Sequence, residues 1–151
     1  MGAGMTITRT PVARATALDA RAGMRHGIPI LLCYLTALAF IAFWPVPVDR
    51  GASGLLRAIS RAVPLLTYDV IESLANVAMF VPFGVLLALV LPARRAWVVP
   101  IALAASLAME AGQALFLPAR TSSVADVVAN VGGAAIGLAV VWIIEQRGPS
   151  R

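Results

Sequence analysis

The chain is divided into four long apolar stretches that are separated by short polar connections. These stretches cover residues 27–44, 68–91, 97–117 and 124–144. Their lengths are close to the roughly 20 residues that a transmembrane helix requires. Pro92 and Pro118 follow the second and third stretches, where the missing N–H and the ring of proline stop a helix. The pattern therefore predicts an all-α fold, a four-helix transmembrane bundle.

The remaining segments are expected to lie outside a transmembrane domain of residues 27–145. Residues 1–26 are polar and Arg-rich, which predicts a disordered cytoplasmic tail, and residues 146–151 would form a second, short cytoplasmic tail. An Arg-rich start is also typical of an organellar transit peptide, but here it runs directly into a long apolar segment. Between the first two spans, the apolar residues of 53–66 recur at helical spacing. This stretch fits equally a short helix on the membrane surface and an ordinary polar connection.

Local signals refine the expected helices. Thr67 is suited to cap the start of the second helix. Pro82 has no N–H to donate to the carbonyl one turn earlier, so a bend is expected there. Gly84 and the pair Gly133-x-x-x-Gly137 are small enough for another backbone to come close. The second and fourth helices are therefore suited to close packing against neighbours.

Composition supports a membrane location. Of the 151 residues, 60% are hydrophobic and 13% are charged, and the mean hydropathy is +0.89. A soluble domain is about 45–50% apolar and about one-quarter charged. The formal net charge of +5 could indicate binding to nucleic acid, but the arginines lie at the ends of the apolar stretches and not on one face. We therefore expect membrane lipid as a partner and no nucleic acid.

The positions of the arginines predict the orientation of the chain. Cytoplasmic connections of membrane proteins carry an excess of Arg and Lys. With the N-terminus inside, the inner segments contain Arg9, Arg14, Arg21, Arg25, Arg94, Arg95, Arg147 and Arg151, and the outer segments contain Arg50, Arg57, Arg61 and Arg120. We therefore expect a multi-pass protein of the cytoplasmic membrane with both termini in the cytoplasm.

Polar and ionisable residues interrupt the apolar stretches near the predicted outer end. The segments 72–77 and 126–131 share the pattern acid-x-x-Ala-Asn-Val. Ionisable groups are expensive inside a bilayer, so they require a partner or a function. Counting 1.5 Å per helical residue places the polar groups of three helices at a similar depth. We predict that the following residues form one polar cluster: Glu72, Asn76, Glu110, Gln113, Arg120, Asp126 and Asn130.

Other kinds of site are not indicated by the sequence. His26 is the only histidine and Cys33 the only cysteine, so neither a metal-ligand spacing nor an intrachain disulfide can be built from them. No phosphate-binding loop occurs. We expect no metal site, no cofactor and no catalytic residue, and the pattern does not predict an oligomeric state.

The motif around Pro82 and the polar residues occur in a recognisable order. Asn76-Val77-Ala78-Met79-Phe80-Val81-Pro82-Phe83-Gly84 is followed by Glu110-x-x-Gln113, Arg120 and Asp126-x-x-x-Asn130-x-Gly132. This order and spacing resemble the VanZ-like family of membrane proteins over residues 69 to about 140, whereas residues 1–66 carry no recognisable part of it. The resemblance implies a bacterial integral membrane protein. A named member of that family is associated with low-level resistance to the glycopeptide teicoplanin.

Three roles are compatible with the predicted cluster. A binding protein would use Arg120, whose planar fork suits phosphate, together with the Asn76 and Asn130 side chains as polar contacts, to engage an envelope lipid precursor or a glycopeptide target at the outer face. An intramembrane enzyme acting on a lipid headgroup would use Glu110 and Asp126 as acid and base, but the sequence offers no evident nucleophile. A purely structural cluster would join the helices by contacts averaging under about 1 kcal/mol each. We favour the non-enzymatic binding protein and keep the enzyme as the alternative.

Overall fold

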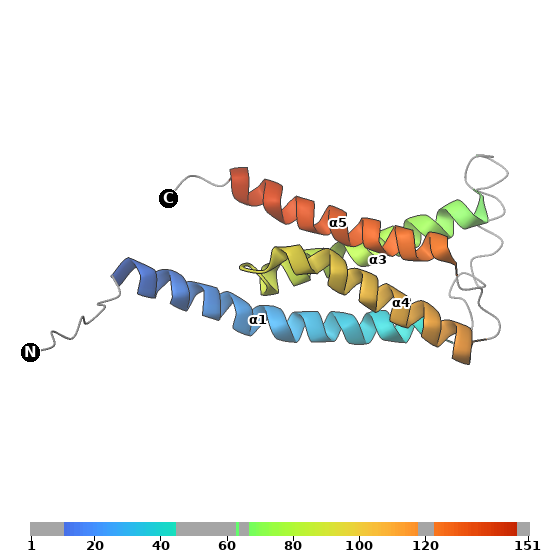
Figure 1. Ribbon diagram of the computed structural model, residues 1–151, viewed down its shortest axis with the longest axis horizontal. Coiled ribbons are helices and arrows are strands. Elements are labelled where there is room, and N and C mark those ends of the chain that lie inside the picture. Colours follow the sequence, from blue (N-terminus) through green and yellow to red (C-terminus); the bar gives the residue numbers. More distant parts are fainter. Residues whose placement is uncertain (1–10, 45–62, 64–66, 118–122, 148–151) are drawn as a thin grey trace, which may run out of the picture.

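The computed structural model describes residues 11–44, 63, 67–117 and 123–147. Its elements are α1 (Pro11–Ala42), α3 (Tyr68–Val90), the short 3-10 helix η2 (Arg95–Trp97), α4 (Val98–Phe116) and α5 (Val124–Arg147). The four α-helices lie roughly along one long axis (Figure 1), and the described residues contain no strand. The predicted all-α, four-helix bundle is thus confirmed. The stretch 53–66 lies outside the described residues apart from Val63, so the two interpretations of it remain open.

The first helix begins earlier than the sequence pattern indicated. We expected a disordered tail up to residue 26, whereas α1 is helical from Pro11 onward. Proline is favoured in the first turn of a helix, and the segment after it is rich in Ala and Arg, which are strong helix formers. Polarity alone is therefore a poor guide to disorder in this segment. The other three helices start and end close to the predicted limits.

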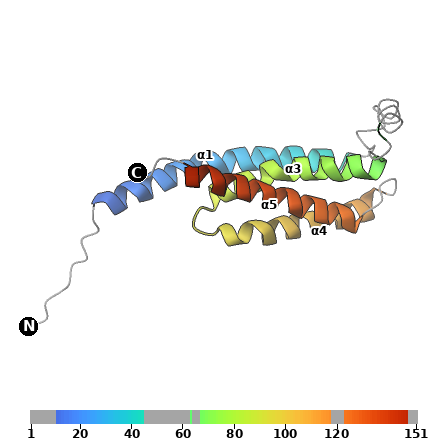
Figure 2. The ribbon, with the colours of Figure 1, turned by 90° about the horizontal axis from the view of Figure 1, so that it is seen from above.

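The helices alternate in direction, which gathers their ends into two groups. The end of α1 and the start of α3 lie at the same end of the bundle as the end of α4 and the start of α5 (Figures 1 and 2). We call this end the polar end, because the candidate site described below lies there. At the opposite end, α3 passes through η2 into α4. Thr67 caps α3 as predicted, since its Oγ1 accepts a hydrogen bond from the Val70 N–H at 3.4 Å.

The tightest helix pair is formed by α3 and α5, which run side by side and parallel (Figure 2). Glycines make this approach possible. A Cβ added at Gly84 would lie 2.7 Å from the Ala134 Cα, and one at Gly133 would lie 3.0 Å from the Phe80 Cβ. Small residues of this kind let helix backbones touch in membranes, where packing rather than the hydrophobic effect drives association. The predicted close packing of the glycine positions is confirmed.

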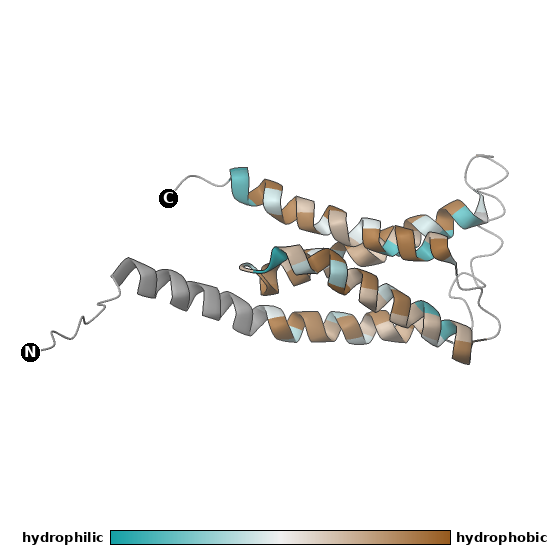
Figure 3. Cartoon of the chain, in the orientation of Figure 1, coloured by the Kyte–Doolittle hydropathy of each residue, from teal (hydrophilic) through white to brown (hydrophobic). Residues whose placement is uncertain are grey.

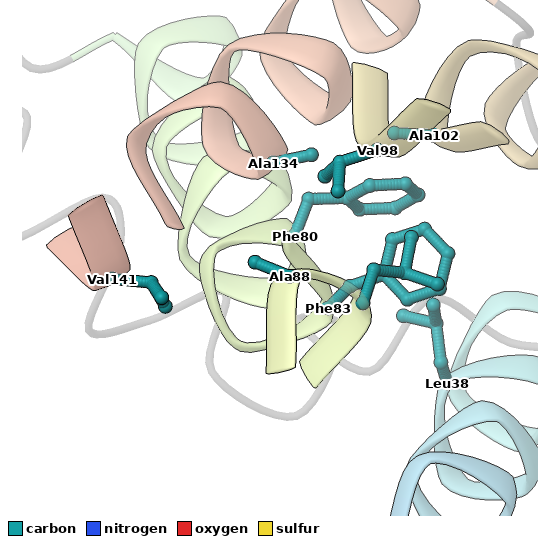
Figure 4. Close-up of a cluster of buried hydrophobic side chains, with 9 residues drawn as sticks. Leu38, Phe80, Phe83, Ala88, Val98, Ala102, Ala134 and Val141 are labelled. Carbon is teal, nitrogen blue, oxygen red and sulfur yellow. The ribbon is translucent and has the colours of Figure 1, made fainter. Parts of the chain in front are cut away.

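The apolar core lies where α3 meets the other three helices. Phe80 and Phe83 are buried and pack edge to face, with ring centroids 5.4 Å apart. Figure 4 shows them facing Leu38 of α1 and Val98 of α4. Aromatic pairs of this geometry contribute about 0.5–1.5 kcal/mol beyond their buried area. The core thus fixes α3 at the centre of the bundle and sets the positions of the neighbouring helices.

A polar contact also joins α1 to α3. The Tyr34 hydroxyl on α1 donates a hydrogen bond to the backbone carbonyl of Met79 on α3. Met79 lies just before Pro82, which occupies the interior of the same helix. The contact therefore anchors α1 beside the proline-containing turn.

The outer surface of the bundle is apolar. Three described helical segments are long and apolar enough to cross a membrane: Asp69–Val90, Arg95–Phe116 and Val124–Arg147. The apolar part of α1, Gly27–Ala42, is shorter. Figure 3 shows hydrophobic residues along α3, α4, α5 and the coloured part of α1, with hydrophilic residues mainly toward the ends of α3, α4 and α5. The bundle therefore has the surface of a membrane protein; its predicted orientation in the bilayer stays a prediction.

Candidate functional site

Five polar residues of the described chain are buried, and all of them lie on α4 and α5: Ser106, Glu110, Gln113, Asp126 and Asn130. Ser106 and Glu110 are four residues apart on α4, and Asp126 and Asn130 are four residues apart on α5, so each pair shares one helix face. These two faces are linked by the hydrogen bonds described below. The result is a polar layer between α4 and α5 that starts at the polar end and extends one turn into the bundle.

The first link joins α3 to α5. The Asn76 Nδ2 donates a hydrogen bond to the Asp126 Oδ1 at 2.7 Å. Asp126 lies in the first turn of α5 and is only 8% exposed. A carboxyl group in the first turn of a helix interacts favourably with the helix dipole, so the Asn76 amide and the dipole of α5 both compensate the burial of the Asp126 side chain. The two matching acid-x-x-Ala-Asn-Val segments thus meet, with the Asn of one bonded to the acid of the other.

The second link joins α4 to the start of α5. The Glu110 Oε2 accepts a hydrogen bond from the Ser123 N–H at 3.1 Å, and the Ser123 Oγ accepts one from the Ala125 N–H at 3.1 Å. The first N–H groups of a helix have no partner within the helix itself. Ser123 therefore caps α5 from within the chain, and Glu110 binds the backbone of that capping residue from the neighbouring helix. Glu110 and Asp126 are both positioned at the positive end of α5.

The third link lies one turn deeper. The Asn130 Nδ2 donates a hydrogen bond to the Ser106 Oγ at 3.0 Å, and both residues are 0% exposed. The Asn130 Oδ1 is buried and has no hydrogen-bond partner among the described residues. Asn130 was predicted as a member of the polar cluster, whereas Ser106 was not. The signal for Ser106 was available in the sequence, because it lies one helical turn from Glu110 on the same face.

Gln113 faces a different neighbour from Glu110. Its Nε2 donates a hydrogen bond to the backbone carbonyl of Ala42 at 2.9 Å. Ala42 is the last residue of α1, and the last carbonyls of a helix have no partner within it. Gln113 thus satisfies the end of α1 with an amide from α4. Nearby, a Cβ added at Gly112 would lie 2.7 Å from the Phe43 ring, so α1 and α4 also pack closely here.

Hydrogen bonds in the described part of the chain involve five of the seven predicted cluster residues. Asn76, Glu110, Asp126 and Asn130 connect α3, α4 and α5 near the polar end, and Gln113 extends the set to α1. Glu72 is exposed near the start of α3. Arg120 lies outside the described residues, so its predicted place in the cluster is still a prediction. The described residues include no group of three or more His, Cys, Asp or Glu residues that could hold a metal ion.

The opposite end of the bundle carries an ion pair of its own. The two terminal nitrogens of Arg95 in η2 donate to the two carboxylate oxygens of Glu145 in α5, at 2.5 and 2.6 Å. This fork arrangement is the strong form of an arginine–carboxylate contact. The Arg95 side chain is 25% exposed and the Glu145 side chain is 49% exposed. Solvent therefore screens the pair and limits its contribution to stability. Its geometric effect is to hold the α3–α4 connection against the end of α5.

A helical bundle with an apolar surface and a buried polar layer near one end defines the class: this is a membrane protein. The model of the VanZ/LLP1 family matches residues 31–145, which is more than half of the chain, so the protein belongs to the VanZ/LLP1 family. The match begins in α1 and thus extends the resemblance noted in the sequence toward the N-terminus. No curated protein and no solved structure matches the chain.

Proposed function

We propose that this protein is a non-enzymatic component of the bacterial cell envelope that binds an envelope lipid or a glycopeptide-type target at its polar end. In this proposal, the polar end faces outward from the cytoplasmic membrane. Arg120, in the connection between α4 and α5, supplies the cationic contact to a phosphate or carboxylate of the ligand, because its planar fork matches both groups. The protein would contribute to glycopeptide resistance through this binding.

The observation that carries the proposal is the contact between Glu110 and the Ser123 N–H, at 3.1 Å. Ser123 is the last residue of the connection that contains Arg120, so Glu110 fixes one end of that connection to α4. A buried carboxylate costs about 2.5–3.5 kcal/mol on insertion scales, more than a polar contact between helices returns. A carboxylate that only joined two helices could be replaced by apolar packing. A role in positioning the ligand-binding connection would explain why a carboxylate, and not an apolar side chain, occupies position 110.

The same contacts argue against the enzyme alternative. A general acid or base must lie within hydrogen-bonding reach of its substrate. Glu110 and Asp126 are each only 8% exposed, and each already accepts a hydrogen bond from Ser123 or Asn76. Catalysis by this pair would require these internal contacts to open first. Binding at the connection above them requires no such change.

The test is complementation of a deletion strain that is exposed to a panel of envelope-targeting antibiotics, teicoplanin among them. We expect the wild-type chain to restore the wild-type susceptibility profile, Arg120→Ala to fail, and Glu110→Gln to restore it in part. Arg14→Ala, in the N-terminal part of α1, is the matched control and should complement fully. Full complementation by Arg120→Ala at wild-type membrane levels would overturn the proposal, and turnover of a labelled envelope lipid by the purified protein would favour the enzyme.

A further inference from the structure

The end of the bundle opposite the polar end has a surface that the proposed function does not use. The fork between Arg95 and Glu145 holds η2 against the last turns of α5. Trp97 follows Arg95 by two residues, and Trp142 precedes Glu145 by three, so the ion pair brings the two tryptophans to the same end of the bundle. Figure 1 shows the α3–α4 connection and the end of α5 at this end.

The side chains around the ion pair are exposed and share one chemistry. Trp97 is 60% exposed and Trp142 is 57% exposed. Arg94 precedes the ion pair in the chain, Arg147 follows it, and both are exposed. The Glu145 carboxylate already binds Arg95, so the guanidinium groups of Arg94 and Arg147 give the surface a net positive charge. We call these four residues, Arg94, Trp97, Trp142 and Arg147, the basic aromatic surface.

We propose that the basic aromatic surface binds the headgroups of anionic phospholipids in the adjoining leaflet. Tryptophan is enriched at the level of the headgroups, where its ring lies among the upper acyl chains and its N–H meets water. Arginine beside such residues meets lipid phosphates, and its fork donates two hydrogen bonds to one phosphate. The ion pair between Arg95 and Glu145 joins the two halves of this surface. It holds Arg94 and Trp97 of the connection near Trp142 and Arg147 of α5.

The interaction would orient the bundle with the polar end at the far interface. Lipid binding at the basic aromatic surface is independent of ligand binding through Arg120. Each of the two proposals can therefore fail without the other.

The experiment uses tryptophan fluorescence of the full chain in phosphatidylcholine vesicles that contain a minority of phosphatidylglycerol. Trp44 is the only other tryptophan, so Trp44→Phe leaves Trp97 and Trp142 as the only reporters. A brominated lipid quenches a tryptophan that it touches. We expect brominated phosphatidylglycerol to quench more strongly than brominated phosphatidylcholine at the same mole fraction, and added salt to reduce the difference.

Two further variants decide the assignment. Arg94→Gln together with Arg147→Gln should reduce the apparent preference for phosphatidylglycerol by about fivefold per arginine. Asp69→Asn together with Glu72→Gln, at the opposite end, should leave it unchanged. Equal quenching by the two brominated lipids in the Trp44→Phe chain would overturn the proposal. So would a preference that survives loss of both arginines, with helical content confirmed by circular dichroism.

Discussion

Gly137 of α5 lies directly against the backbone of Val81 on α3. A Cβ at this position would collide with the Val81 carbonyl oxygen and would lie 2.7 Å from the Val85 backbone nitrogen. Neither of these neighbours is the end of a flexible side chain, so neither can rotate away. The short distance between α3 and α5 is therefore possible only because Gly137 has no side chain. Because Asn76 of α3 bonds to Asp126 of α5, the same distance also sets the geometry of the polar end.

Replacing this glycine should separate the two helices. We expect Gly137→Ala to destabilise the protein by about 1–3 kcal/mol, the usual cost of overpacking. Gly132→Ala is the matched control, since a Cβ at Gly132 meets nothing within 4 Å. There the higher helix propensity of Ala should be neutral or should stabilise by up to about 1 kcal/mol. The measurement is the unfolding midpoint of the purified protein in detergent, and equal midpoints for the two variants would contradict the argument.

The hydrogen bond between Glu110 and Ser123 can be tested without changing charge between the compared variants. Glu110→Gln keeps an oxygen that accepts from the Ser123 N–H, whereas Glu110→Met has a similar length and no comparable acceptor. Both variants are neutral, so the cost of a buried charge cancels in the comparison. We expect the Gln variant to be more stable by about 1 kcal/mol, because the Met variant leaves a backbone donor unpaired. Hydrogen exchange at the Ser123 amide should be faster in the Met variant.

Equal exchange rates at that amide would show that Glu110 does not hold Ser123 in solution. A Met variant as stable as the Gln variant would lead to the same conclusion. The start of α5 would then be capped by the Ser123 side chain alone.

The sequence was sufficient to predict the helical bundle and the depth of the polar residues along the helices. It was not sufficient to predict which polar residues bond to each other. The spacings Asp126-x-x-x-Asn130 and Glu110-x-x-Gln113 fix which residues share a helix face. The partner of Gln113 depends on where α1 ends and how it lies against α4. Its partner is a backbone carbonyl, that of Ala42, which has no signature in the sequence. Side chains that bind backbone atoms across helices are set by tertiary packing.

The start of α1 illustrates a different limit. The segment after Pro11 is polar, a pattern that predicts disorder, although its residues favour a helix. A helix that continues into an apolar segment has no nucleation cost at its junction, so propensity can extend it. Gly84, Gly133 and Gly137 were easier to interpret, because a small residue in an apolar helix lets a neighbouring backbone come close.

The buried pair of Ser106 and Asn130 should respond differently to single and double substitution. Ser106→Ala removes the hydroxyl that accepts from the Asn130 amide in a fully buried position, and the cost of an unsatisfied buried group is about 1–3 kcal/mol. Replacing both residues with apolar ones removes the unpaired group. We therefore expect Ser106→Ala with Asn130→Leu to be more stable than Ser106→Ala alone. Unfolding in detergent measures both, and a double variant that is less stable than the single one would contradict this view of the pair.

The bond between Asn76 and Asp126 should appear as a coupling energy in a double-mutant cycle. Asn76→Ala, Asp126→Ala and the double variant give the interaction after the separate effects of each substitution are subtracted. Polar contacts between membrane helices average about 0.6 kcal/mol and reach about 1.7 kcal/mol. We expect a value toward the upper limit, because the contact is 2.7 Å long and its acceptor is a buried carboxyl group. Asn76→Ala paired with Glu145→Ala, at the opposite end of the bundle, should be additive within about 0.3–0.5 kcal/mol. A coupling for Asn76 and Asp126 that is no larger than this control would mean that α3 and α5 are held by their glycine contacts alone, and that the two repeated segments meet without binding each other.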